Sequence, residues 1–216
     1  MSRTIGQRNF MLVCWKNKYL GIMSEYDLYT RILAPKLKPK NQKVLTEQTG
    51  GKMQKADISS DGKICYTVYR YDQGEQREQF FPFFNNTHDG DMGKAETPSP
   101  EGLLRFCDYI LLAERNNRLY VLLIELKSGA NGDAIKQLDA TATFMDYVKN
   151  TAIRIAEENG YQNFNVENVK VRKIVLKPIN TKSTTNVIKS LKEQLGMDAT
   201  TIYFSSIKFP LRLFLQ

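Results

Sequence analysis

Histidine is nearly absent from this sequence, which carries a single copy, His88. Serine–histidine triads, histidine-based nuclease sites and multi-histidine zinc sites all need histidines that the chain does not supply. His88 stands in a stretch rich in Asn, Asp and Gly, residues 85–93, where Asp89 and Asp91 are further candidate metal ligands. Clusters of these residue types are usually turns, so we interpret this stretch as a loop.

Cysteine and long apolar runs are also scarce. The three cysteines, Cys14, Cys65 and Cys107, are far apart and never form a CxxC pair. This spacing indicates neither a disulfide framework nor a zinc knuckle, and a reducing cytoplasm is the expected location. No apolar run approaches the roughly 20 residues of a membrane span, and the first residues lack the apolar core of a signal peptide. We therefore predict a cytoplasmic protein that does not enter a membrane.

Apolar residues and positive charge are present in quantity. The 216 residues, 42% hydrophobic and 25% charged, fit a single globular domain with ample material for a core. The net charge of +8 favours an anionic partner such as nucleic acid, although a basic balance is more often a solvated surface. The basic segment 36–43 has the same two interpretations, a phosphate contact or a solvated linker, and we favour the linker.

A predicted β-hairpin organises the middle of the chain. Two apolar runs, Tyr109–Ala113 and Leu119–Ile124, flank a short polar loop, which is the pattern of a hairpin buried on both faces. Asn tolerates positive φ, so Asn116 and Asn117 favour a tight primed turn at the centre of that loop. This turn centre fixes which residues of the two strands face each other.

In that register, Asp108 lies directly opposite Glu125. Facing like charges are destabilising, and desolvation beside an apolar sheet adds to the cost, so a cation is expected between them. A divalent metal is the natural candidate. Because strand side chains alternate, Lys127 shares the face of Glu125, whereas Leu126 points the other way. Asp108, Glu125 and Lys127 are therefore predicted to converge on one point.

The rest of the chain mixes predicted strands and helices, as in an α/β protein. Strands are expected at Ile64–Tyr71 and Glu78–Phe84, forming a second hairpin, and at Val169–Leu176 and 200–205. Helices are expected from Ser24 to Pro35, from Ala134 to about Asn159 with Asp133 as its cap, and from Thr184 or Thr185 to Leu195. Residues 10–15 fit a strand or the start of a helix, and the polar stretch 85–100 is a long loop that leads toward Asp108.

The central motif resembles the PD-(D/E)xK nuclease superfamily, which includes restriction endonucleases and Holliday-junction resolvases. The matching features are an Asp at the head of one strand, a neighbouring strand ending Glu-x-Lys, and then a helix and another strand. The resemblance covers residues 105–176, the expected catalytic core within a single domain of residues 1–216. It implies a restriction-endonuclease-like fold, a central mixed β-sheet flanked by α-helices, with residues 1–100 as an N-terminal helix and hairpin elaboration.

The resemblance also implies an activity and a set of roles. Asp108 and Glu125 match the carboxylates that bind Mg²⁺, for which Mn²⁺ is expected to substitute, and Lys127 matches the lysine that orients or activates the attacking water. The backbone carbonyl of Leu126 is expected as a further ligand. Gln137, early in the helix after the motif, is a secondary candidate. The implied function is hydrolysis of phosphodiester bonds in nucleic acid, with DNA as the expected substrate and a homodimer as an expected assembly.

Two features depart from the family pattern. Cys107 stands where the family often has proline, and Gln137 is followed four residues later by Thr141, so the QxxxY signature of some members is absent. Some members take an additional acidic ligand from the first helix. Glu25 and Glu47 are both open as that ligand.

Two other interpretations compete with a nuclease. The first is a non-catalytic nucleic-acid-binding or scaffold protein that retains the nuclease-like fold, with Lys127 merely pairing Asp108 or Glu125. The second is a structural ion cluster. Metal binding and digestion assays on DNA and RNA distinguish these interpretations from the nuclease.

Overall fold

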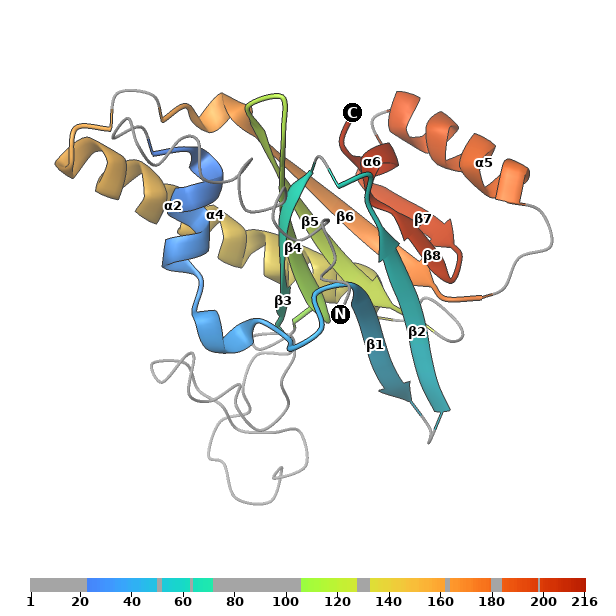
Figure 1. Ribbon diagram of the computed structural model, residues 1–216. Helices are drawn as coiled ribbons and strands as arrows, with labels where there is room; N and C mark the ends of the chain where they lie inside the picture. The colour runs from blue at the N-terminus through green and yellow to red at the C-terminus, as the bar shows by residue number, and fades with distance from the viewer. Residues whose placement is uncertain are drawn as a thin grey trace, which may run out of the picture.

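A five-stranded mixed β-sheet forms the middle layer of the protein in the computed structural model (Figure 1). The structure describes residues 23–49, 52–62, 64–71, 106–127, 133–161, 164–179, 184–197 and 199–216. The strand order is β3-β4-β5-β6-β7, in which β3, β4 and β5 are antiparallel and β5, β6 and β7 are parallel. The strands are β3 (Cys65–Arg70), β4 (Tyr109–Arg115), β5 (Arg118–Leu126), β6 (Val169–Lys177) and β7 (Thr201–Ser205).

The predicted hairpin is β4–β5, and its predicted register is confirmed. Asn116 and Asn117 have φ values of 53° and 57°, the positive values that a type I′ turn requires at both central positions. Arg115 pairs with Arg118 and Tyr109 pairs with Ile124, so the next residues along the ladder are Asp108 and Glu125. Alternate residues of both strands belong to the two cores on opposite faces of the sheet, so a slip of one residue would exchange their side chains between the cores and would turn Glu125 toward the small sheet.

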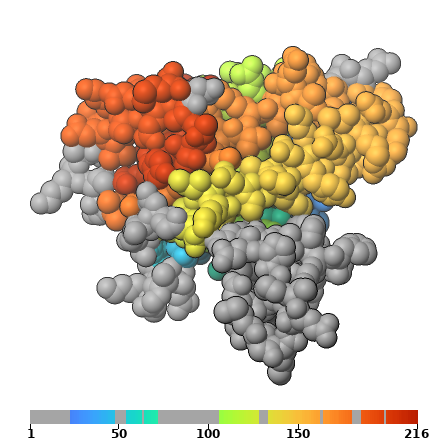
Figure 2. Space-filling view, turned by 180° about the vertical axis from the view of Figure 1, so that it is seen from behind, coloured from blue at the N-terminus to red at the C-terminus, as the bar shows by residue number. Residues whose placement is uncertain are grey.

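Two helices, α2 (Glu25–Ile32) and α4 (Ala134–Glu158), cover one face of this sheet, and Figure 2 shows α4 running across it. Ser24 caps α2 as expected, because its Oγ accepts a hydrogen bond of 3.2 Å from the Asp27 N–H. Asp133 occupies the N-cap position of α4 as expected, but its side chain makes no capping hydrogen bond. The helical spacing of the apolar residues still gives α4 a buried stripe that packs on the sheet, made of Ala134, Leu138, Thr141, Met145, Val148, Ala152 and Ala156.

A smaller sheet and two further helices cover the opposite face. The order in this sheet is β1-β2-β8, with β1 antiparallel to β2 and β2 parallel to β8. Figure 1 shows β1 and β2 in front of the central sheet, and the side chains between the layers form a continuous apolar core. The elements of this layer are β1 (Val44–Thr49), β2 (Lys52–Ser59), α5 (Thr184–Gly196), β8 (Lys208–Pro210) and α6 (Leu211–Phe214).

The fold is thus a mixed α/β structure with two mixed sheets flanked by helices. Two short 3₁₀ helices, η2 (Pro35–Leu37) and η5 (Val166–Asn168), complete the described elements. Within the ranges given above, no helix combines the length and apolar character needed to cross a membrane.

Part of the sequence prediction cannot be compared with the structure. Residues 10–15, the strand expected at 78–84 and the loop 85–100, with His88, Asp89 and Asp91, lie outside the described residues. The strand expected at 64–71 is present as β3, and its described partner is β4.

Candidate functional site

Asp108 and Glu125 meet where β4 begins and β5 ends. Each carboxyl group accepts a hydrogen bond from a backbone N–H of the other strand. The Asp108 N–H donates to Glu125 Oε2 at 3.1 Å, and Asp108 Oδ2 accepts the Leu126 N–H at 2.7 Å. Glu125 is only 1% exposed, although it is a carboxylic acid near the end of a strand. The two carboxyl groups are therefore held by reciprocal hydrogen bonds at adjacent strand ends.

Lys127 and Gln137 complete a connected group on the face of the sheet that α4 covers. Lys127 Nζ lies 2.7 Å from Glu125 Oε1 and donates to Gln137 Oε1 at 3.2 Å. Gln137 Nε2 in turn donates to the Phe106 carbonyl at 3.2 Å. A carbonyl can only accept and an ammonium can only donate, so these two partners fix the orientation of the Gln137 amide. The structure thus brings together the predicted site residues, since hydrogen bonds and an ion pair connect Asp108, Glu125, Leu126, Lys127 and Gln137.

Burial and charge act strongly on this group. Burial raises the pKa of Glu125 above its ordinary value, Lys127 opposes the shift, and the charge of Glu47 adds to it. Burial alone would lower the pKa of Lys127. The hydrogen bond and charge of Glu125, with the charges of Asp108 and Glu47, raise that pKa instead. The lysine is thus held as an ammonium among three acidic side chains.

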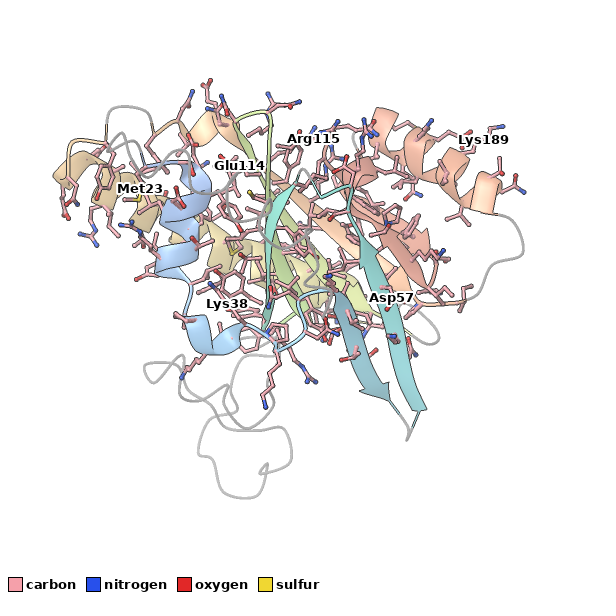
Figure 3. All side chains as sticks on the ribbon, in the orientation of Figure 1. Met23, Lys38, Asp57, Glu114, Arg115 and Lys189 are labelled. Atoms are coloured by element: carbon pink, nitrogen blue, oxygen red, sulfur yellow. The ribbon has the colours of Figure 1, made fainter. Side chains whose placement is uncertain are left out.

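Of the two open acidic candidates, Glu47 lies near this group and Glu25 does not. Tyr109 follows Asp108 in the chain, and its hydroxyl donates to the Thr46 carbonyl at 2.6 Å. This bond holds β1 close to the start of β4. Glu25 instead accepts a hydrogen bond from the Asn165 N–H at 2.8 Å. Burial raises the pKa of Glu114, and the charges of Asp27 and Glu25 add to that shift, so Glu25 lies near Glu114. Glu114 marks the turn end of the hairpin, at the opposite end of β4, as its label in Figure 3 shows.

Cys107 and Thr141 hold the head of β4 against α4, a contact that the sequence analysis missed. The Cys107 N–H donates to Thr141 Oγ1 at 2.9 Å, and that hydroxyl donates to the Gln137 carbonyl at 2.9 Å. A proline at position 107 would have no N–H to donate, so Cys107→Pro would lose this contact. One signal in the sequence could have predicted this contact: Thr141 is a polar residue on the apolar stripe of α4, and a buried hydroxyl needs a hydrogen-bond partner.

Burial raises the pKa of the Cys107 thiol well above its ordinary value, and its Sγ donates to the Tyr109 carbonyl at 3.2 Å. Because a thiol must ionise to act as a nucleophile, Cys107 has a structural role beside the carboxylates. It is not a candidate for chemistry.

The donor set of this group suits a hard divalent cation, since carboxylate and carbonyl oxygens are the ligands that Mg²⁺ prefers. With the carboxylates ionised, Asp108, Glu125 and Glu47 around the single ammonium of Lys127 leave two negative charges, which a divalent cation would neutralise. Glu47 Oε2 is also buried, with no hydrogen-bond partner among the described residues. Within the same residues, however, no three Asp, Glu, His or Cys side chains are close enough to form a metal-binding group.

The described basic segment borders the same end of the sheet. Lys38 lies over the Tyr69 ring at 5.5 Å, and Gln42 Oε1 accepts the Val68 N–H at 2.6 Å, so the segment follows β3. Figure 3 shows Lys38 well away from Glu114, toward the other end of β3. A hollow at the far end of α4, lined by Ile153, Ala156, Glu157, Gly160, Tyr161, Phe164, Asn165 and Val166, contains none of the predicted site residues.

A scan against protein-family models, a search of curated proteins and a search of solved structures found no match to this chain.

Proposed function

We propose that the protein is a metal-dependent nuclease of the PD-(D/E)xK type, which hydrolyses phosphodiester bonds in nucleic acid, with DNA as the substrate. The observation that carries this proposal is the convergence of Asp108, Glu125 and Lys127 at the adjacent ends of β4 and β5. Buried carboxylates in excess over the available ammonium are costly to fold, and a cation offsets that cost.

In this proposal each side chain has one task. Asp108, Glu125 and the Leu126 carbonyl hold the metal. When bound, Mg²⁺ polarises the phosphodiester and lowers the pKa of a coordinated water. Lys127 orients the attacking water and offsets the negative charge that develops in the transition state. Gln137 holds the ammonium of Lys127 in place through its fixed amide.

Substrate binding is assigned to the basic segment 36–43 beside β3, in place of the linker role that its sequence alone favours. Lys36, Lys38, Lys40 and Lys43 are exposed, and the segment lies at the same end of the sheet as the carboxylates. Lysine contacts to phosphates supply affinity without reading the base sequence, so these lysines would bind any nucleic acid strand. The net charge of +8 supports the same partner.

A digestion assay tests the proposal. The purified protein is incubated with single-stranded DNA, double-stranded DNA and RNA, each with Mg²⁺, with Mn²⁺ and with a chelator. We expect metal-dependent cleavage of DNA that the chelator stops and that Asp108→Asn lacks. Metal-independent binding of nucleic acid without any cleavage would support the non-catalytic scaffold and would overturn the proposal.

Gln137 provides a prediction about positioning. Gln137→Leu removes the amide that joins Lys127 to the Phe106 carbonyl, and we expect kcat to fall by about 10- to 100-fold, the usual effect of losing an outer partner of a metal site. A matched control is Gln194→Leu, because Gln194 also binds through both ends of its amide, to the Tyr203 N–H at 2.7 Å and carbonyl at 3.0 Å. The control should keep wild-type kcat, and an equal loss in both variants would show a general effect on folding.

A further inference from the structure

Basic side chains gather at the turn end of the β4–β5 hairpin, on the face of the sheet that α6 covers. Arg115 and Arg118 pair directly across the hairpin, and Lys170 of β6 pairs with Tyr120, two residues beyond Arg118. Because strand side chains alternate, all three cations point to the face on which Tyr120 is buried. Arg115 Nη1 donates to the Arg212 carbonyl of α6 at 3.3 Å, which agrees with this face, and Figure 3 shows Arg115 between the hairpin turn and α6.

The positive charge of this group is mostly unbalanced. Within the part of the chain that the structure describes, neither Arg118 nor Lys170 forms an ion pair, and Arg115 donates to neutral backbone carbonyls. Arg212 adds a fourth cation, which pairs with Asp61 at 3.6 Å. We call Arg115, Arg118, Lys170 and Arg212 the distal basic patch. Like charges that face each other across strands are destabilising, so an anion bound at this patch would relieve the repulsion.

Glu114, the acidic neighbour of Arg115, does not balance the patch because it lies on the other face. Alternation along β4 directs Glu114 toward α2. The charges of Asp27 and Glu25, both in α2, add to the rise that burial causes in the pKa of Glu114, as expected for side chains on that face. The turn end of the hairpin is therefore acidic toward α2 and basic toward α6.

The distal basic patch is remote from the proposed catalytic group. Arg118 is the first residue of β5, and Glu125 follows seven residues later, near the end of the same strand. At about 3.3 Å per residue, these two positions are about 23 Å apart along β5. Alternation also directs Glu125 to the opposite face, toward α4. A ligand at the patch therefore cannot be the reacting phosphodiester itself.

We propose that the distal basic patch binds the phosphate backbone of nucleic acid away from the bond that is cleaved. Arginine offers several N–H donors to phosphate oxygens and lysine offers a point charge, and neither contact requires a particular base. At about 3.4 Å per nucleotide, the distance along β5 corresponds to at least about seven nucleotides between the two contacts. The substrate is thus longer than the catalytic site alone requires. This inference rests on the proposed function for the identity of the anion, but binding is measurable without cleavage.

The experiment measures the affinity of the full chain for a labelled DNA duplex of about 30 base pairs, which is several times longer than the distance between the two contacts. Fluorescence anisotropy is followed in the presence of a chelator, so that no DNA is cleaved. The double variant Arg118→Gln with Lys170→Gln should bind about tenfold or more weakly than the wild type at low salt. The slope of log affinity against log salt should also become shallower by about two, since each lost phosphate contact removes about one.

The matched control is the double variant Lys55→Gln with Arg154→Gln. It removes the same charge from two exposed cations that already have carboxylate partners, Asp57 at 3.2 Å and Glu158 at 2.8 Å. The control should keep wild-type affinity and salt slope. An equal loss in both double variants would show an effect of net charge alone and would overturn the inference.

The thermal midpoint without DNA supplies a second readout. Arg118→Gln with Lys170→Gln removes neighbouring like charges, so its midpoint should equal or exceed that of the wild type. A clearly lower midpoint would identify these cations as structural partners within the fold and would overturn the inference.

A third double variant, Lys38→Gln with Lys40→Gln, separates this inference from the proposed function, because both lysines belong to the basic segment 36–43. If one DNA contacts both surfaces, the fold losses in affinity should multiply when the two double variants are combined. A loss only in Lys38→Gln with Lys40→Gln overturns the inference and preserves the proposed function. A loss only in Arg118→Gln with Lys170→Gln, together with no cleavage by the wild type, supports the patch and overturns the nuclease. Wild-type affinity in every variant overturns the patch.

Discussion

Glu125→Gln is expected to abolish metal-dependent cleavage while leaving the protein folded. The substitution keeps the size and shape of the side chain and removes its negative charge, so one of the two proposed carboxylate ligands is lost. A neutral amide oxygen is a weaker ligand for a hard cation than a carboxylate. Cleavage of DNA in excess Mg²⁺ should fall below detection, and metal titration should show the corresponding loss of binding.

The same substitution should leave the metal-free protein as stable as the wild type, or slightly more stable. Burial raises the pKa of Glu125, which means that the folded protein disfavours its charged form, and glutamine has no such penalty. The amide oxygen can still accept the Asp108 N–H that Glu125 Oε2 accepts at 3.1 Å. The thermal midpoint in the presence of a chelator measures this effect.

Glu114→Gln is the control for both measurements. Burial likewise raises the pKa of Glu114, so its replacement removes a similar penalty at the turn end of the hairpin, far from the proposed metal. It should keep full cleavage. A marked drop in the midpoint of metal-free Glu125→Gln, without a drop in the control, would identify Glu125 as the structural partner of Lys127 and remove it as a metal ligand.

The register of β4–β5 was predictable because local chemistry determines it. Asn116 and Asn117 set the turn, and the apolar runs on either side set which residues are buried, so the opposition of Asp108 and Glu125 followed without tertiary information. Alternation along β5 then placed Lys127 beside Glu125, as the 2.7 Å contact confirms. This part of the site depends on neighbours in the sequence.

The small sheet was not predicted because its strands carry weak local signals. β1 and β2 contain several polar residues that are uncommon in strands. β8 has three residues, too few for any periodic pattern. These strands are held by contacts with distant parts of the chain, such as the bond between Tyr109 and Thr46.

The choice between Glu25 and Glu47 required the same long-range information. Both are acidic residues in the N-terminal part, and nothing local indicates which one approaches the central hairpin. Packing of α2 directs Glu25 to Asn165, whereas the small sheet brings Glu47 toward Glu125. The role of Thr141 also required long-range information, because its hydrogen bond to Cys107 depends on how α4 crosses the sheet.

Lys127→Ala separates the two roles that remain open for this lysine. If the ammonium orients the attacking water, turnover should fall by about two to four orders of magnitude, the usual scale for losing one positioned catalytic group. Metal affinity should stay similar or rise modestly, because the ammonium that lies 2.7 Å from Glu125 no longer competes with the cation for that carboxylate.

Lys173→Ala is the matched control, since Lys173 also has a carboxylate partner, Asp139 at 2.6 Å, and a similar side-chain exposure of 27% against 22% for Lys127. Its loss should leave turnover unchanged. If Lys127 only neutralises carboxylates in an inert protein, Lys127→Ala will bind Mg²⁺ more tightly and neither form will cleave. Mg²⁺ affinity and cleavage, measured together for the wild type and both variants, distinguish these two roles. Full cleavage by Lys127→Ala would remove the lysine from the mechanism, and with it the Glu-x-Lys part of the proposed site.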